Sequence, residues 1–433
     1  MAISSEGKTE CPYHGYTDVV RDGSLLDYQI QARPNYYYRE LREKSPIHYD
    51  ERLGMYLVSR YEDLQTIIAD PVTFSSELGY TEQYAKGFKD EFKRILIEKG
   101  GGFFPDAIKT DPPYHTRIRR LLEKAFTAQR VALLEPRIEE IIRDVIAEVG
   151  ERGEADGVSD IAAPITIRFI VEQLGLGQVE EKKIQDWSYA VVAQAGRMQT
   201  REQMIHNAEL ICELQQFLIA EIRDRESTQR DDMISDLVHA TDEDGNRLTF
   251  EEIVSLARAL LVAGNETTTT AISHLLVLLA TQPNVADELY RNSDDNRYLL
   301  RFTEELLRWE PPSRGLTRMT TREVDVGGIR VPERAHLLLL WASGNDMETV
   351  FPSPRTFDVS RKNVMRHLSF GGGAHRCVGA ALARLEIKLT AREIIRQLDD
   401  IRLSIPVGEL KFVPTIATHP LAALPMTFKK RKQ

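Results

Sequence analysis

The residues best suited to chemistry lie in segment 370–379, where a single cysteine, Cys377, follows three consecutive glycines. Glycine has no Cβ, so the backbone at 371–373 can turn tightly and lie close against a bound ligand. After Gly379 the sequence consists largely of strong helix formers, which places Cys377 just ahead of or within the first turn of a helix. The start of a helix stabilises a thiolate. This arrangement indicates that Cys377 is a metal ligand.

A lone thiolate held by backbone dipoles is suited to haem iron, because the sulfur pushes electron density toward oxygen on the other side of the metal. The ordinary alternative for an isolated cysteine is a buried, inert side chain. The glycines, His375 and the following helix together favour the ligand over that alternative.

The loop resembles the haem-binding loop of the cytochrome P-450 monooxygenases in its pattern Phe370-x-x-Gly373-x-His375-x-Cys377-x-Gly379. The resemblance implies that Cys377 is the axial ligand of haem b (iron protoporphyrin IX). It also implies that Phe370 shields the sulfur and that Gly379 lets the helix pack near the ring. Gly371 and His375 are expected to contribute to cofactor binding.

The longest predicted helix begins at the capping box Thr249-x-x-Glu252 and runs to Gln282, where Pro283 stops it. At ~1.5 Å per residue it would be roughly 50 Å long, enough to cross the whole domain. Its middle is apolar on nearly every side, so we expect it to be buried.

Within that helix, the run Ala-Gly-Asn-Glu-Thr-Thr at 263–268 places a glycine, an acid and hydroxyls in the least polar part of the chain. A glycine inside a helix costs about 1 kcal/mol relative to alanine, and burying an unpaired carboxylate costs more, so a purely structural helix should avoid both. The small residues Ala263 and Gly264 would let a planar ligand or dioxygen approach the backbone. Thr267 could then hydrogen-bond bound oxygen, and Glu266 could relay protons from solvent.

The alternative is a Thr267 hydroxyl bonded back to a helical carbonyl and a Glu266 side chain that reaches the surface. The run is similar to the oxygen-activating motif of the same family, small-Gly-x-acid-Thr. The resemblance therefore implies that Glu266 and Thr267 are catalytic.

Haem carries two propionates and needs fixed cations. His115 and Arg119 are four residues apart at the start of a predicted helix and point the same way. The family uses such a His-x-x-x-Arg pair on a propionate, and Arg318 and His375 resemble two further propionate partners. Without the resemblance, His115 would be a capping residue and Arg119 a solvated side chain.

Glu305 and Arg308 have the spacing of a solvated surface pair, but the resemblance implies a buried ion pair behind the haem loop. The family usually adds an arginine directly before Phe357. This chain has Thr356 there and Arg355 one place earlier, which leaves the third member of the network open.

Basic residues gather near the predicted haem loop and suggest a patch on an otherwise acidic protein: Arg117, Arg120, Lys124, Arg366 and Arg376. An acidic ferredoxin or a flavodoxin-type donor could dock there by electrostatic steering. An ordinary charged surface explains the same residues equally well.

The net charge of -10 argues against a general nucleic-acid binder. The first residues lack the apolar core of a signal peptide, and no stretch offers eighteen uninterrupted apolar residues, so we expect a soluble cytoplasmic protein without a membrane anchor. Three cysteines cannot form a disulfide framework.

The remaining patterns predict a protein that is mainly α with a minor β portion. Residues 1–27 are expected to form a partly flexible N-terminal arm and residues 28–433 a single domain, because no linker or repeat interrupts the apolar periodicity. The resemblance covers the same 28–433 range and implies the cytochrome P-450 fold, with the long central helix over the haem.

Local patterns also predict individual elements. A hairpin is expected at 47–58, followed by a helix with the capping box Ser59-x-x-Glu62, and a second hairpin at Gly327-Gly328. Residues 113–240 are almost wholly helical in pattern, 303–308 form a short helix and 403–428 are strand-like. One amphipathic stripe within the helical region consists of Leu133, Ile138, Ile141, Ile142, Val145 and Ile146.

The resemblance implies a monomeric monooxygenase that inserts one atom of O2 into a C–H bond of a small or medium hydrophobic molecule, with electrons from NAD(P)H through a separate donor. One rival is a haem-thiolate sensor, against which Glu266 and Thr267 argue. Another is a peroxide-driven peroxygenase, which in this family typically replaces that pair. Arg314 could pair with a substrate carboxylate, although a surface or propionate position is favoured.

Overall fold

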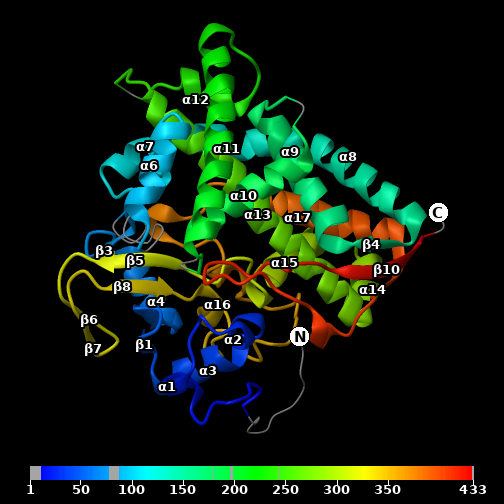
Figure 1. The fold of residues 1–433 in the computed structure, drawn as a ribbon. Helices are drawn as coiled ribbons and strands as arrows, with labels where there is room; N and C mark the ends of the chain where they lie inside the picture. The colour runs from blue at the N-terminus through cyan, green and yellow to red at the C-terminus, as the bar shows by residue number, and fades with distance from the viewer. Residues whose placement is uncertain (1–10, 78–86, 178, 196–197, 243, 432–433) are drawn as a thin grey trace.

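The computed structural model describes residues 11–77, 87–177, 179–195, 198–242 and 244–431. Helices form most of the molecule, and the largest sheet lies beside the N-terminal helices (Figure 1). The helices are α1 Val19–Asp22, α2 Tyr28–Ala32, α3 Asn35–Lys44, α4 Tyr61–Ala69, α6 Lys89–Lys99, α7 Tyr114–Ala125, α8 Ala128–Arg152, α9 Ala163–Leu174, α10 Glu181–Ala195, α11 Arg201–Ser227, α12 Met233–His239, α13 Phe250–Thr281, α14 Pro283–Arg291, α15 Asn296–Trp309, α16 Trp341–Gly344 and α17 Ala380–Gln397. The predicted class, mainly α with minor β, is confirmed.

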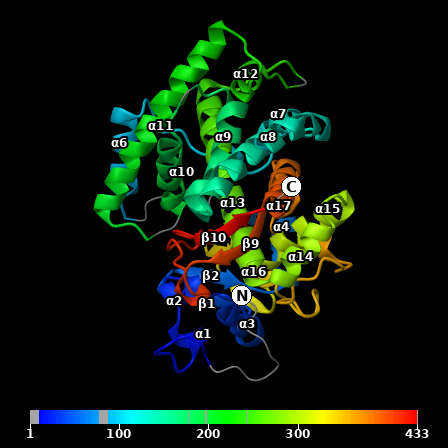
Figure 2. The same cartoon turned by 90° about the vertical axis from the view of Figure 1, so that its right-hand side faces the viewer.

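Helix α13 runs through the middle of the molecule, as the two perpendicular views show (Figure 1, Figure 2). Its predicted capping box is present: Thr249 Oγ1 accepts from the Glu252 N–H at 3.2 Å, and Glu252 accepts from the Thr249 N–H at 2.8 Å. Because α9, α10, α11 and α17 all contact it, nearly every side of its middle is buried. The predicted length and burial are confirmed.

The main sheet has the strand order β1-β2-β8-β5-β3. Its strands are β1 Ile47–Asp50, β2 Met55–Val58, β3 Phe74–Ser75, β5 Leu316–Thr320 and β8 His336–Leu339. The predicted hairpin pairs β1 with β2, with Ile47 opposite Val58. The second predicted hairpin joins β6 Val324–Val326 to β7 Ile329–Val331, and Gly327 and Gly328 both have positive φ, as a tight two-residue turn requires.

Some local predictions are wrong. Helix α4 begins at Tyr61 with Arg60 as its cap, because the Ser59 hydroxyl instead donates to the Pro46 carbonyl at 3.1 Å. Leu133 is 74% exposed and does not belong to the buried stripe, while the other five residues are buried. The short helix predicted at 303–308 is the end of the longer α15.

The helical region 113–240 contains one short strand, β4 Glu154–Asp156, and the region 403–428 is strand only at its ends, in β9 Leu398–Leu403 and β10 Pro425–Lys430. β10 pairs with both β4 and β9. Because β4 and β10 are far apart in sequence, a local pattern does not reveal their pairing.

The described part of the predicted arm, residues 11–27, packs against the main sheet. Tyr13, Val19, Val20 and Leu25 are buried in one cluster with residues of α2, α3 and β2. Among the described residues, no helix combines the length and the apolar character needed to cross a bilayer.

Candidate active site

The segment 370–379 forms a tight loop that leads into α17. The Cys377 N–H donates to the Phe370 carbonyl at 2.9 Å, and Gly379 is the residue before the helix. Gly371 and Gly373 have positive φ. A Cβ at Gly373 would lie 2.4 Å from the Ile68 carbonyl oxygen, so this glycine lets the loop pack against α4.

Gly379 differs from Gly373, because a Cβ added there would meet no protein atom within 4 Å. The side chain of Cys377, two residues earlier, is exposed. The start of α17 is therefore open beside the thiol.

Although the Cys377 side chain is accessible on one side, the surrounding protein desolvates the thiol and raises its pKa, while the Gly379 N–H and the nearby Arg119, Arg384 and Arg376 lower it. We expected the helix start to favour the thiolate. In the protein alone, burial outweighs that effect.

Phe370 is held beside the loop by Arg384, whose guanidinium lies 4.3 Å from the ring centroid. Arg384 also pairs with Glu304, and His367 Nε2 donates to the same carboxylate at 2.9 Å. Glu304 is fully buried, and these contacts hold the pKa of its carboxyl at about 2 against the effect of burial. The aromatic ring is thus fixed by a buried ionic group.

The predicted propionate-binding residues come together in one electropositive cluster. The rings of His115 and His375 lie 4.1 Å apart, and both Nε2 atoms are buried without a hydrogen-bond partner. Burial and the neighbouring Arg318, His115 and Arg119 lower the pKa of His375 to about 3. Burial and Arg119 also lower the pKa of His115, which Asp111 and Glu123 offset only in part.

Such a cluster attracts anions, because Arg119 and Arg318 carry positive charge and two buried ring nitrogens lack partners. A flat, dianionic cofactor beside Cys377 would supply the missing charge and acceptors. The residues present therefore fit haem.

On α13, Ala263 is exposed and Thr267 is partly accessible, although the helix around them is buried. The Thr267 hydroxyl donates to the Ala263 carbonyl at 2.9 Å, which is the back-bonding that the alternative interpretation describes. Gly264 lies against α9, where a Cβ would be 3.1 Å from Ile170 Cδ1. Helix packing accounts for this glycine.

Glu266 does not reach the surface, so the second part of the alternative interpretation is wrong. Its side chain is only 5% exposed, and burial raises the pKa of its carboxyl to about 7, with the Thr418 hydroxyl acting in the opposite direction. A carboxyl with a pKa near neutrality can both hold and release a proton at physiological pH.

A set of polar residues behind Glu266 was missed in the sequence. Asn265 accepts from Thr166 of α9 at 3.1 Å and donates to Ser188 of α10 at 3.1 Å, while Thr269 lies 2.7 Å from Thr166. Ser273 continues the stripe one turn later. The four-residue spacing of 265, 269 and 273 in an apolar helix was the available signal.

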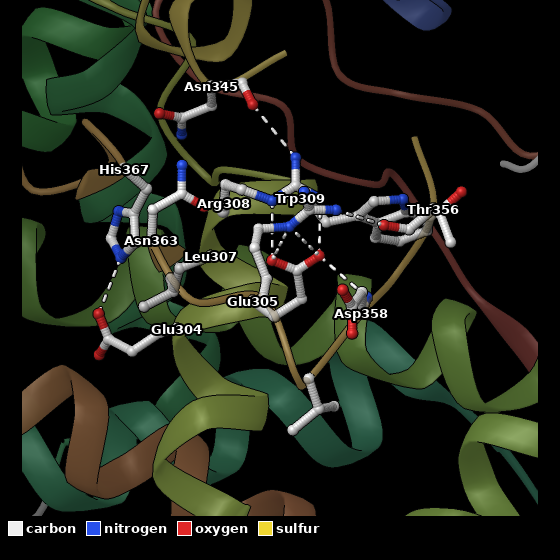
Figure 3. Close-up of polar contacts among 12 residues, drawn as sticks. Glu304, Glu305, Leu307, Arg308, Trp309, Asn345, Thr356, Asp358, Asn363 and His367 are labelled. Carbon is white, nitrogen blue, oxygen red and sulfur yellow. Dashed lines mark hydrogen bonds and ion pairs between the residues drawn. The ribbon is translucent and has the colours of Figure 1, made fainter. Parts of the chain in front are cut away.

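The ion pair between Glu305 and Arg308 is fully buried, with its closest atoms 2.8 Å apart (Figure 3). Its third member is Arg361, which lies 3.2 Å from Glu305 and also donates to the Thr356 carbonyl at 3.1 Å. Arg355 points elsewhere and pairs with Glu310 at 3.3 Å.

Arg314 is 1% exposed, so the surface position favoured for it is wrong. Its Nε donates to the Thr418 carbonyl and its Nη2 to the Gln31 carbonyl, both at 2.6 Å. The guanidinium therefore joins α2 to the C-terminal segment.

The expected basic patch is smaller than predicted. Arg117 pairs with Glu252, and Lys124 donates to the Thr241 carbonyl at 2.9 Å. The patch residues that remain exposed are Arg120, Lys124, Arg366 and Arg376, and of these Lys124 is held by the Thr241 carbonyl.

Comparison with known proteins places this site in a family. The family model described as cytochrome P-450 matches residues 196–400. The cytochrome P-450 monooxygenase PikC of Streptomyces venezuelae is 31% identical over 439 residues, covering 100% of this chain and 99% of the relative. The chain belongs to the cytochrome P-450 family. The family assigned from the sequence is confirmed, and the chain is an oxidoreductase of the monooxygenase type that uses haem.

Other relatives agree with this cytochrome P-450 assignment. The 6-deoxyerythronolide B hydroxylase of Saccharopolyspora erythraea is 31% identical, over 90% of this chain and 94% of the relative. The solved haem domain from Tepidiphilus thermophilus has a TM-score of 0.86 and 27% identity, covering 94% of this chain and 97% of that chain. Cytochrome P-450 CREJ, solved in complex with (4-ethylphenyl) dihydrogen phosphate, has a TM-score of 0.85 and 30% identity, covering 94% and 100%.

Proposed function

We propose that this protein is a haem-thiolate monooxygenase in which Cys377 ligates the iron and one atom of O2 enters a C–H bond of a hydrophobic substrate. The observation that carries the proposal is the accessible Cys377 thiol together with His115 and His375, whose buried Nε2 atoms lack hydrogen-bond partners. Haem b, when bound, supplies the activation of dioxygen.

His115, Arg119, Arg318 and His375 are proposed to hold the two propionates. Neutral imidazoles donate hydrogen bonds to carboxylates, and the arginines supply charge. Phe370, fixed under Arg384, would exclude water from the sulfur. These contacts would orient the cofactor without requiring Cys377 to carry the whole binding energy.

Glu266 and Thr267 are proposed to hold and transfer protons. The Glu266 carboxyl holds a proton in a buried position and passes it toward the open face of α13. Thr267 can rotate its hydroxyl away from the Ala263 carbonyl at the cost of one hydrogen bond, roughly 1 kcal/mol. Ala263 leaves space beside that hydroxyl.

For the substrate, we propose a hydrophobic molecule of medium size. Three relatives are named for hydroxylation of 6-deoxyerythronolide B, of erythromycin at C-12 and of mycinamicin IV. These names support the upper end of the small-to-medium range predicted from the sequence.

Electrons are proposed to come from NAD(P)H through a ferredoxin or flavodoxin-type donor that binds a monomer in the cytoplasm. The exposed Arg120, Arg366 and Arg376 would attract such an acidic partner. Charge reversal of these three residues should slow electron transfer and reduce its salt dependence.

The proposal is tested on the purified, haem-loaded protein after reduction and treatment with carbon monoxide. The native protein should give the strongly red-shifted Soret band of thiolate ligation, and Cys377→His should lose it while keeping the pigment. Cys212→Ser is the matched control, because Cys212 lies on α11 and is buried against α6. A native protein loaded with haem but lacking that band would refute the proposal.

A further inference from the structure

The face of α13 that turns away from Ala263 and Thr267 is polar although it is buried. Asn265, Thr269 and Ser273 lie along it at four-residue intervals, and Asn265 and Thr269 bond to Thr166 of α9. Asn265 also bonds to Ser188 of α10. Glu266 lies at the edge of this stripe.

A small cavity opens beside Glu266 on the same side. The volume in it that the centre of a water molecule can occupy is about 10 Å³. That is about the room one buried water needs, provided it also finds two to four polar partners. The lining supplies such partners, among them Glu266, Ser188, Asn265 and Thr270.

Tyr189 and Gln185 of α10 also line the cavity. Tyr189 is 37% exposed, and the Gln185 amide lies 3.5 Å from its hydroxyl. The two side chains therefore connect the cavity lining with solvent on the α10 side.

The polar groups beside Glu266 in the cavity are uncharged. Among the described residues, no ion pair includes Glu266, and the polar groups beside it are hydroxyls and amides from α10, α13 and the C-terminal segment. Burial raises the pKa of the Tyr189 phenol, and Glu266, Asp156 and Asp186 raise it further, while the hydrogen bond from Gln185 lowers it. Tyr189 therefore stays a neutral phenol, and its oxygen accepts from the Gln185 amide.

We propose that this cavity holds one water and that Tyr189, Gln185 and the water form the proton inlet to Glu266, entering from the α10 side. This inference rests on the proposed role of Glu266 in moving protons. A proton from bulk water reaches the cavity water, and that water gives one of its own protons to the Glu266 carboxylate. The water is regenerated at each transfer, and no oxidant or reductant is consumed.

The first test is a high-resolution crystal structure of the haem-loaded protein. We expect an ordered water within hydrogen-bond distance of the Glu266 carboxyl and of at least one lining hydroxyl. A dry cavity would overturn the proposal.

The second test measures hydrogen–deuterium exchange of the Glu266 carboxyl by rapid-mixing infrared spectroscopy at about pH 6, with Glu266→Gln used to assign the band. The double variant Tyr189→Phe/Gln185→Leu removes the hydroxyl and the amide that connect the cavity with solvent. It should slow exchange of the Glu266 carboxyl by about tenfold or more. Tyr290→Phe is the control, because Tyr290 is 43% exposed on α14, and its exchange should match the native protein.

Unchanged exchange in the double variant would overturn the inlet. If that variant folds poorly, Tyr189→Phe alone should still slow exchange, and native-like exchange in it would count equally against the proposal. Neither measurement depends on turnover. Absence of the red-shifted Soret band would therefore refute the proposed function. Native-like exchange in the Tyr189 variants, or a cavity without an ordered water, would refute only the inlet.

Discussion

Arg361 lies 3.2 Å from the Glu305 carboxylate, five residues after the position where the family usually places the third arginine of this network. Arg361 is 6% exposed and also donates to the Pro352 carbonyl at 2.7 Å. The loop 352–361 thus folds back so that a later arginine reaches the same acid. Glu305 then has two cationic partners, Arg308 and Arg361.

Arg361→Leu should therefore destabilise the protein strongly, because Glu305 stays buried with one cation fewer. We expect a loss of about 3 to 5 kcal/mol in the free energy of unfolding. Urea titration followed by circular dichroism measures it. Arg330→Leu is the control, since Arg330 is a surface partner of Glu323 with 79% side-chain exposure, and it should cost less than about 1 kcal/mol. Equal effects of the two substitutions would contradict the assigned role of Arg361.

Thr267→Ala should divert electrons into hydrogen peroxide, because the hydroxyl proposed to guide protons is lost. Product formed per NAD(P)H consumed should fall by roughly tenfold or more. Thr281→Ala is matched to it, since Thr281 makes the same back-bond, to the Val277 carbonyl at 2.7 Å, at the far end of the same helix. Native-like coupling in Thr267→Ala would remove this residue from the mechanism.

Glu266→Gln should change how stability depends on pH. Because the folded pKa is raised from 4.5 to about 7, the folded protein keeps a proton that the unfolded chain has lost, so stability falls as pH rises through this window. The amide cannot lose that proton. The variant should therefore gain up to about 3 kcal/mol over the native protein between pH 4 and pH 8. Glu251→Gln, at the exposed start of α13, should show no such gain.

His419 should affect the pH dependence of stability in the direction opposite to Glu266. Burial, helped by Arg314, lowers its pKa from 6.5 to about 3, although Glu310 lies 3.1 Å away. The unfolded chain binds a proton that the folded protein excludes, so stability is lost as pH falls from 6.5 toward 3. At pH 5 the loss from this group would be about 2 kcal/mol.

Urea titrations at several pH values test this expectation. His419→Gln should flatten the slope of unfolding free energy against pH by about one proton, whatever its effect at pH 7. His206→Gln, at an exposed position on α11, is the control and should leave the slope unchanged. An unaltered slope in His419→Gln would show that another group dominates.

The elements that were predicted correctly are those whose sequence pattern lies within a few neighbouring residues. The capping box at Thr249 and the stop at Pro283 define α13, and two adjacent glycines define the turn between β6 and β7. The haem-loop pattern identified the family for the same reason, since its glycines and cysteine lie within ten residues.

The features that the sequence did not reveal depend on contacts between distant segments. Ser59 has the residue type of a helix cap, but the Pro46 carbonyl takes its hydroxyl. Arg361 reaches Glu305 only because the intervening loop folds back. The polar stripe behind Glu266 finds its hydrogen-bond partners only once α9 and α10 are placed against it. The roles of Cys377 and the propionate-binding cluster stay predictions until haem binding is measured.

Arg314 links the two ends of the chain through one side chain, with the Gln31 carbonyl on one side and the Thr418 carbonyl on the other. Thr418 also faces the Glu266 carboxyl. Shortening the protein past residue 31 would therefore loosen the segment that holds Thr418 in place. We expect such a truncation to disturb proton handling in the core, so expression variants should keep the native residues of α2.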